Sequence, residues 1–226
     1  MIITREERPS GSPYVETIWH YQSEQPGSFI STAAVHWEMV VTRCEGKMML
    51  TVRGPETKAT PAEVAPDAEW LGITFKLGTF MPDFPPGVLL DRNDVNLPEA
   101  TGNSFWLYGS TWEVPTYENV DTFVARLERE GLLKHDPLVD AVRQGQPQDV
   151  SLRTLQYRFV RATGLPHKVI QQIERARRAT TLLKQGTPIL DIAFELGYFD
   201  QSHLTNALKR FLGQTPAQIA DVKQPE

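Results

Sequence analysis

One stretch decides the fold of the C-terminal third of this 226-residue chain: residues 192–204, IAFELGYFDQSHL. Its first part continues a short amphipathic pattern that begins at Ile189 and ends at Leu196. Gly197 then supplies the left-handed backbone that a sharp turn needs. Asp200 is a typical N-cap residue, so a second helix is expected to begin immediately after it. Short helix, glycine turn and capped helix form the layout of a helix-turn-helix motif.

The second helix of this motif is expected to be two-sided. Leu204, Leu208 and Phe211 recur at helical spacing and predict a buried face. The opposite face is polar and would be presented to base edges in a DNA groove, where Gln and Asn can bond adenine bidentately. The residues expected there are Gln201, Ser202, His203, Thr205 and Asn206. Lys209 and Arg210, two turns further on, suit the phosphate backbone.

The pattern extends towards the N-terminus from this motif. Ser151 is a good N-cap and Gly164 a good helix end, and a long helix is expected over about 168–185. Eighteen residues of helix span about 27 Å, which suits two reading helices near one DNA turn of about 34 Å apart. The candidate DNA contacts on the helix from Ser151 are Arg153, Gln156, Tyr157, Arg158 and Arg161. Lys168 and Arg175 of the long helix are further candidates for phosphate contacts.

These residues carry a resemblance to a known family. Residues 151–220 resemble the C-terminal domain of AraC-type helix-turn-helix transcriptional regulators. The segments that carry it are 151–159 (SLRTLQYRF), 162–164 (ATG), 173–178 (IERARR) with Leu182-Leu183, 192–204, and 211–216 (FLGQTP). The resemblance implies two helix-turn-helix subdomains joined by a long helix, and binding of double-stranded DNA. It also implies a bacterial, cytoplasmic protein with no enzymatic activity, no catalytic residue and no cofactor.

The chain departs from the family pattern before the first expected reading helix. The family places a supporting helix and a glycine turn there, but residues 145–150 (GQPQDV) are too few and include a proline. Either 137–143 supports that helix through a longer turn, or the first subdomain is degraded. Two roles therefore stay open for Arg153, Gln156 and Tyr157: they read bases, or they mostly contact phosphates, which position the protein without specifying the sequence.

The N-terminal half has a different composition. Residues 1–150 hold 12 basic and 22 acidic side chains, whereas residues 151–226 hold 11 and 6, so a basic module follows an acidic one. Thirteen of the 17 prolines and all five tryptophans lie before residue 151. Short apolar runs at 35–41, 48–52 and 69–76, separated by turn signals, predict antiparallel strands. We therefore expect an α+β chain whose N-terminal part is an antiparallel β-barrel or sandwich-like domain.

The resemblance implies a cupin-like β-rich sensory or dimerisation domain that binds a small effector or forms a homodimer. An aromatic set could line an effector pocket, although ordinary core packing uses the same side chains. The candidates are Trp37, Trp70, Phe75, Trp106 and Trp112. The expected domains are 1–116 (sensory), 117–135 (connecting helix or hinge) and 136–226 (DNA-binding).

Other classes of function find little support in the sequence. No apolar run is long enough to cross a bilayer, and residues 1–12 lack the apolar stretch of a secretory signal. A metal site is not expected, because His36 and Glu38 have no evident third ligand. Cys44 stands alone, so it forms no internal disulfide and has no activating partner. The sequence therefore favours a sequence-specific DNA-binding transcription regulator. The alternative is an effector-binding or partner-binding protein whose helix-turn-helix domain has lost specific DNA readout.

Overall fold

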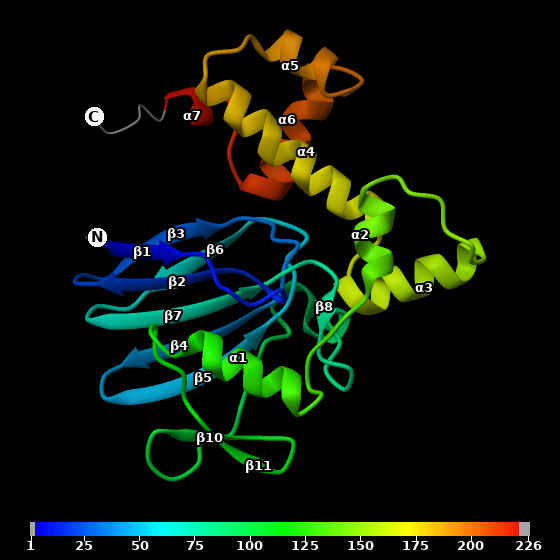
Figure 1. Ribbon diagram of the computed structural model, residues 1–226. Helices are drawn as coiled ribbons and strands as arrows, with labels where there is room; N and C mark the ends of the chain where they lie inside the picture. Colours follow the sequence, from blue (N-terminus) through cyan, green and yellow to red (C-terminus); the bar gives the residue numbers. More distant parts are fainter. Residues whose placement is uncertain (1–2, 222–226) are drawn as a thin grey trace. The chain divides into compact units, whose positions relative to one another are not determined.

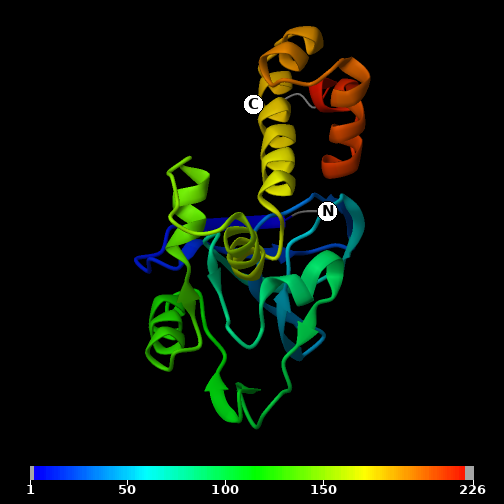
Figure 2. The same ribbon diagram turned by 90° about the vertical axis from the view of Figure 1, so that its right-hand side faces the viewer.

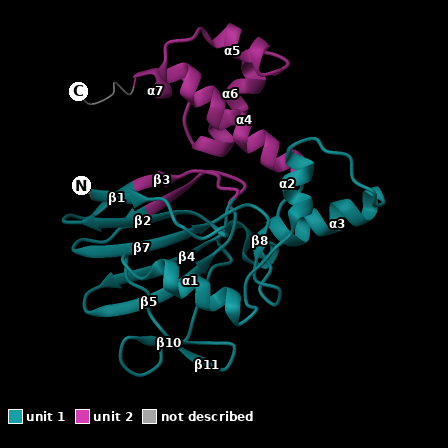
Figure 3. Cartoon of the chain, viewed as in Figure 1, with its two compact units in different colours: residues 1–28, 36–55, 63–166 teal, residues 29–35, 56–62, 167–226 magenta. Residues whose placement is uncertain are grey.

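The structure is a computed structural model that describes residues 3–221, and it divides into two compact units (Figure 3). Unit 1 comprises residues 1–28, 36–55 and 63–166. Unit 2 comprises residues 29–35, 56–62 and 167–226. This division does not follow the expected linear boundaries near 116 and 135, because two short segments of the N-terminal half group with the C-terminal helices.

Unit 1 is built on an antiparallel six-stranded sheet in the order β1-β2-β7-β4-β5-β9 (Figure 1). The strands are β1 (Ile3–Arg8), β2 (Val15–Ser23), β4 (Glu38–Cys44), β5 (Lys47–Arg53), β7 (Ala68–Phe75) and β9 (Val95–Asn96). Val40 and Val41 of β4 are buried between β5 and β7. A tight turn joins β4 to β5, with left-handed backbone at both Glu45 (φ 52°) and Gly46 (φ 72°), as a two-residue hairpin requires.

The remaining elements of unit 1 surround this sheet. They are β8 (Thr79–Phe80) paired with β12 (Lys134–His135), β10 (Ser104–Leu107) paired with β11 (Ser110–Glu113), the 3-10 helix η1 (Pro86–Arg92), α1 (Val120–Arg129), α2 (Pro137–Arg143) and α3 (Leu152–Thr163). Helix α1 buries its apolar side, including Phe123 and Leu127, in the same core as Ile18, Met39 and Leu71 of the sheet. The sheet face under α1 is therefore the main hydrophobic core.

Unit 2 combines four helices with a short two-stranded ribbon. The helices are α4 (His167–Lys184), α5 (Ile189–Glu195), α6 (Gln201–Leu212) and α7 (Pro216–Asp221). Helices α6 and α7 pack against α4, whose Ile170, Ile173 and Ala176 are buried (Figure 2). The ribbon consists of β3 (Gly27–Ser31) and β6 (Thr60–Val64), most of which belongs to unit 2.

The expected fold class, α+β with an antiparallel β-rich N-terminal part and an all-α C-terminal part, is confirmed. The long helix expected over 168–185 spans 167–184. Within residues 3–221, none of the helices has the length and apolar character that crossing a membrane demands.

Candidate nucleic-acid interface

The corner between α5 and α6 has the geometry that its sequence indicates. Ile192 and Ala193 of α5 are buried, and α5 packs against both α4 and α6. Gly197 has a φ of 68°, which a side chain at this position would strain. Tyr198 follows with only 6% of its surface exposed, so its ring fills the inside of the corner. The chain thus reverses within a few residues and starts α6 at a fixed place.

Helix α6 begins at a well-formed N-cap. The Asp200 side chain accepts a hydrogen bond of 2.7 Å from the backbone N–H of His203. Leu204, Leu208 and Phe211 are buried, so the opposite face of the helix is turned outward within unit 2. The residues on that outward face are Gln201, Ser202, His203, Asn206, Lys209 and Arg210, which are exposed, and Thr205, which is half-buried.

His203 is held in one orientation on this face. Its Nδ1 accepts a hydrogen bond of 3.3 Å from the backbone N–H of Phe199, so the neutral ring carries its proton on Nε2. The ring meets Tyr198 edge to face at 5.2 Å between centroids. On the other side of Tyr198, the Arg175 guanidinium lies 4.4 Å from the centroid of the tyrosine ring. Burial raises the pKa of the Tyr198 hydroxyl, although the charge of Arg175 acts in the opposite direction.

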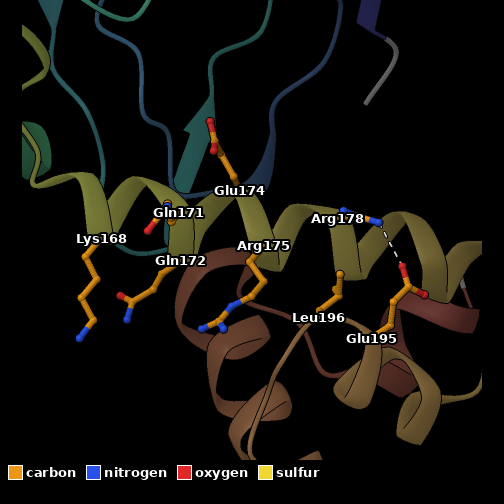
Figure 4. Close-up of a pocket in the computed structure, with 8 residues that line it drawn as sticks. All are labelled: Lys168, Gln171, Gln172, Glu174, Arg175, Arg178, Glu195 and Leu196. Atoms are coloured by element: carbon orange, nitrogen blue, oxygen red, sulfur yellow. Dashed lines mark hydrogen bonds and ion pairs between the residues drawn. The ribbon is translucent and has the colours of Figure 1, made fainter. Parts of the chain in front are cut away.

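A polar groove of about 660 Å³ lies beside the corner (Figure 4). Lys168, Gln172 and Arg175 point to the same side of α4, while Glu174 points to the opposite side. Arg175 also donates a hydrogen bond of 3.3 Å to the carbonyl oxygen of Gly197, which fixes it at the corner. The full lining is Lys168, Gln171, Gln172, Glu174, Arg175, Arg178, Glu195 and Leu196. Because Arg178 is paired with Glu195 at 3.1 Å, Lys168 and Arg175 supply most of the positive charge available to a ligand.

The candidate DNA contacts on α3 are in a different setting, within unit 1. Arg158 donates two hydrogen bonds, of 2.6 and 3.0 Å, to the Asp136 carboxylate at the start of α2, and these raise the pKa of the guanidinium. Arg161 lies 5.8 Å from the centroid of the Phe80 ring. Arg153, Gln156 and Tyr157 are exposed, Tyr157 with 64% of its surface. Two of the five candidates thus already have partners in their own unit.

Helix α2 occupies the place where the family pattern has a supporting helix. It packs against α3, and the chain between the two helices runs through residues 144–151. This is the arrangement required if 137–143 supports α3 through a longer turn. Helix α3 also packs against η1 and β8, and its buried Phe159 and Ala162 serve that contact. Helix α3, the first of the two helices expected to contact DNA, is thereby part of the β-rich unit.

The aromatic residues that were candidates for an effector site do not line a common pocket. Trp37 is buried and stacks on Phe75 at 3.9 Å, and its indole N–H donates to the carbonyl oxygen of Thr79. Trp112 is buried against Phe123 in an edge-to-face contact. These three candidates lie in the core, and Trp70 is half-buried on β7. Their role as effector contacts stays a prediction, to which the structure gives no specific support.

Trp106 differs from the other candidates because it lines a pocket. It is 46% exposed and borders a mainly apolar cavity of about 300 Å³ in unit 1. The lining residues are Val52, Met81, Phe84, Leu97, Pro98, Trp106, Leu107, Tyr108 and Gly109. Most of these were not singled out from the sequence, since nothing in a short apolar run distinguishes a pocket wall from a core.

Two further features of unit 2 escaped sequence reasoning. Gln171 and Gln172 line the groove, and the signal for them was their spacing from Lys168 and Arg175 along α4. Phe194 and Phe199 are 90% and 93% exposed on either side of the corner. A helical pattern alone would have placed such large apolar side chains inside.

A short helix, a glycine corner and a capped helix with an outward polar face define a helix-turn-helix module. Comparison with known proteins agrees: residues 148–221 match the family described as "Helix-turn-helix domain". The match confirms the helix-turn-helix domain that the sequence predicts in this part of the chain. The same region is 41% identical over 71 residues to the HTH-type transcriptional regulator VirS of Mycobacterium tuberculosis, strains CDC 1551 / Oshkosh and H37Rv. That match covers 31% of this chain and only 21% of the length of VirS.

Solved structures of ToxT from Vibrio cholerae align over nearly the whole chain but weakly. The crystal structure from strain O395 covers 98% of this chain and 99% of its own, with a TM-score of 0.41 and 9% identity. A second ToxT structure, bound to (E)-4-(8-methylnaphthalen-1-yl)but-3-enoic acid, has a TM-score of 0.41 and 9% sequence identity. It covers 96% of this chain and 98% of its own. Similarity of this degree carries no inference about the ligands of the present chain.

Proposed function

We propose that this protein is a sequence-specific DNA-binding transcription regulator in which α6 reads the bases. One observation carries the proposal. Helix α6 turns a row of hydrogen-bonding side chains outward within unit 2, while its apolar side is buried and the glycine corner and N-cap fix its start. A surface helix without a partner needs no such concentration of amide, hydroxyl and imidazole groups, whereas a helix that enters a DNA major groove does.

The residues of α6 have distinct proposed roles. Gln201 and Asn206 carry amides that can bond adenine N6 and N7 bidentately. His203 offers an Nε2–H donor, because its Nδ1 is already used by the backbone of Phe199. Such a donor suits guanine N7 or O6, or a phosphate oxygen. Ser202 and Thr205 carry hydroxyls that suit either a base or a phosphate.

The proposed phosphate contacts come from both α6 and α4. Lys209 and Arg210 are exposed near the end of α6. Lys168 and Arg175 point into the groove beside the corner, and Arg175 is next to the start of α6. The basic balance of residues 151–226 fits this use, since release of counterions from phosphates supplies most non-specific affinity.

One observation favours the alternative function, a partner-binding module without specific DNA readout. Arg158 on α3 is paired with the Asp136 carboxylate within unit 1, which makes its charge less available to a phosphate, while Arg161 lies beside the Phe80 ring but stays exposed. If α3 contributes nothing, a single reading helix has little specificity, and the domain would act as a partner-binding module instead. In the proposed regulator, the exposed Arg153, Gln156 and Tyr157 add contacts beside those of α6.

The β-rich unit has the proposed role of sensing a small effector or forming a homodimer in the bacterial cytoplasm. The apolar pocket beside Trp106 is the place in unit 1 that best suits a small apolar ligand. A ligand that prefers the folded state raises the melting temperature. Thermal-shift screening of the full chain and of Trp106→Ala against apolar metabolites therefore tests this role: a shift in the wild type that Trp106→Ala loses would support it.

The central experiment is selection of genomic fragments by the purified full chain, followed by gel shifts of the selected fragments over a range of salt concentrations. The proposal expects preference for particular fragments together with a steep fall in affinity as salt rises. Weak, salt-insensitive binding with no fragment preference would refute it and favour the partner-binding alternative.

A further inference from the structure

The end of α6 is held by two segments from the N-terminal half of the chain. A helix leaves its last four carbonyl groups without partners inside the helix. In α6 the carbonyl of Lys209 accepts from the N–H of Gly213 at 3.0 Å, as a helix end commonly does. The next two carbonyls accept from elsewhere: that of Arg210 from the N–H of Ala59, and that of Phe211 from the N–H of Ala33, both at 2.7 Å.

These two segments, 29–35 and 56–62, are tied to each other and will be called the clamp. The N–H and carbonyl groups of Ala34 and Glu56 exchange two hydrogen bonds of 2.9 Å. The hydroxyl of Ser31 adds a hydrogen bond of 3.1 Å to the Glu56 carboxylate. Because the segments are cross-linked in this way, they can act on α6 as one piece.

The clamp is also bonded to the long helix. Arg177 of α4 donates a hydrogen bond of 2.7 Å from Nη2 to the carbonyl oxygen of Ala33. Ala33 is fully buried, and its N–H is the group bonded to Phe211 of α6. One residue of the clamp therefore connects both helices that position the reading face.

We propose that the clamp positions α6 for reading DNA, with Ala33, Ala59 and Arg177 as positioning residues that do not themselves touch the nucleic acid. Base readout requires that a helix be held to within about 0.5 Å and 10–20° of its productive place. Helix α6 is 12 residues long, about 18 Å, so a small tilt at its last turn displaces Gln201 at its first turn.

The clamp also supplies a covalent route from the β-rich unit to the reading helix. Segment 29–35 leads from β2 to β4, and segment 56–62 leads from β5 to β7. A change in the spacing or tilt of those strands, such as an effector would cause, is transmitted to the ends of both segments. This inference rests on the proposed function, because it assigns to the N-terminal half a means of altering base readout.

The test uses the full chain and compares affinity for the selected genomic fragment with affinity for random DNA. Arg177→Gln removes the side-chain donor, and Ala59→Pro removes a backbone N–H without changing the charge. Each is expected to lower the ratio of the two affinities about twofold to tenfold, the effect of one net hydrogen bond. An unfolded fraction of protein cancels from this ratio, so simple destabilisation does not move it.

Two matched variants control for charge and for chemistry. Arg129→Gln makes the same charge change on an exposed residue of α1, and the ratio should stay at the wild-type value. Arg177→Lys keeps a positively charged donor and should recover part of the lost ratio. Ala59→Pro should leave the slope of log affinity against log salt unchanged, because it removes no phosphate contact.

Hydrogen exchange supplies a readout without DNA. In the wild type, the amides of Ala33 and Ala59 should be protected, and Arg177→Gln should speed exchange at Ala33. Unprotected amides in the wild type would overturn the inference. An unchanged affinity ratio in both Arg177→Gln and Ala59→Pro, with normal binding by the wild type, would overturn it while leaving the proposed function intact. Absence of DNA binding by the wild type would refute the proposed function as well.

Discussion

Gly213 follows α6 at the point where the helix end meets the clamp, and its replacement by alanine should be unusually costly. Its φ is 70°, which alone disfavours a side chain. In addition, a Cβ at this position would lie 2.7 Å from Cγ2 of Ile30 and 3.2 Å from Cβ of Ala59. Gly186, between α4 and α5, has a similar φ of 82° but no atom within 4 Å of an added Cβ. Comparing Gly213→Ala with Gly186→Ala therefore separates the cost of backbone strain, present in both, from the cost of the collision with the clamp, present only in Gly213→Ala.

The expected magnitudes follow from these two terms. Left-handed backbone costs a residue with a Cβ about 1–2 kcal/mol, and this applies to both Gly213→Ala and Gly186→Ala. The collision at Gly213 should add about 1 kcal/mol, the low end of the cost of an extra methyl group, because Ile30 is 42% exposed and its side chain can turn away. In a chain of this length, each kcal/mol lowers the melting temperature by about 2–4 °C. We therefore expect Gly213→Ala to melt roughly 2–4 °C below Gly186→Ala.

Thermal unfolding followed by circular dichroism measures this difference, with urea unfolding as an independent check. The wild type and both variants should have the same far-ultraviolet spectrum before melting. If Gly213→Ala and Gly186→Ala lose the same stability, the clamp does not press against the end of α6 and the structural reasoning is wrong.

Four further predictions concern reading, capping and titration. Gln201→Ala or Asn206→Ala should weaken the free energy of binding to the selected fragment by about 1–3 kcal/mol and that to random DNA by little, as measured by gel shifts. Equal losses of binding on both DNAs would exclude base reading by these residues. Lys209→Ala should weaken binding to both the selected fragment and random DNA, and it should reduce the slope of log affinity against log salt concentration by about one unit. Asp200→Ala should lower the free energy of unfolding by about 0.5–2 kcal/mol, measured in urea, because α6 loses its N-cap. Burial and the Glu7 hydrogen bond raise the pKa of Tyr21 to about 12, so stability should fall as pH rises from about 10 to 12 and Tyr21→Phe should reduce that fall; a melting series over pH checks it.

Local sequence signals were sufficient for the helix-turn-helix corner. Gly197 is needed where the backbone is left-handed, Asp200 caps the next helix, and the apolar spacing from Leu204 orients α6. Each of these is a short-range effect, so the residues involved are neighbours in the chain. The strands expected at 35–41, 48–52 and 69–76 correspond to β4, β5 and β7 for the same reason, since their turns and apolar runs are local, whereas β1 and β2 of the same sheet were not predicted.

The aromatic residues show where local signals stop. Trp37, Phe75 and Trp112 fill the core, while Trp106 borders a pocket, although all four lie in or next to strands. A tryptophan packs equally well against a sheet, a helix or a ligand. Only the arrangement of distant strands and α1 decides which of these surrounds it.

The sequence by itself determined that the chain is α+β, that a basic helical module follows an acidic β-rich one, and which face of α6 is polar. The tertiary structure alone decided that residues 29–35 and 56–62 belong with the C-terminal helices, and that α3 belongs with the β-rich unit. The reason is physical. The contacts at Ala33 and Ala59 are made by backbone N–H groups, which almost every residue possesses, so no side-chain pattern reveals them before the chain has folded.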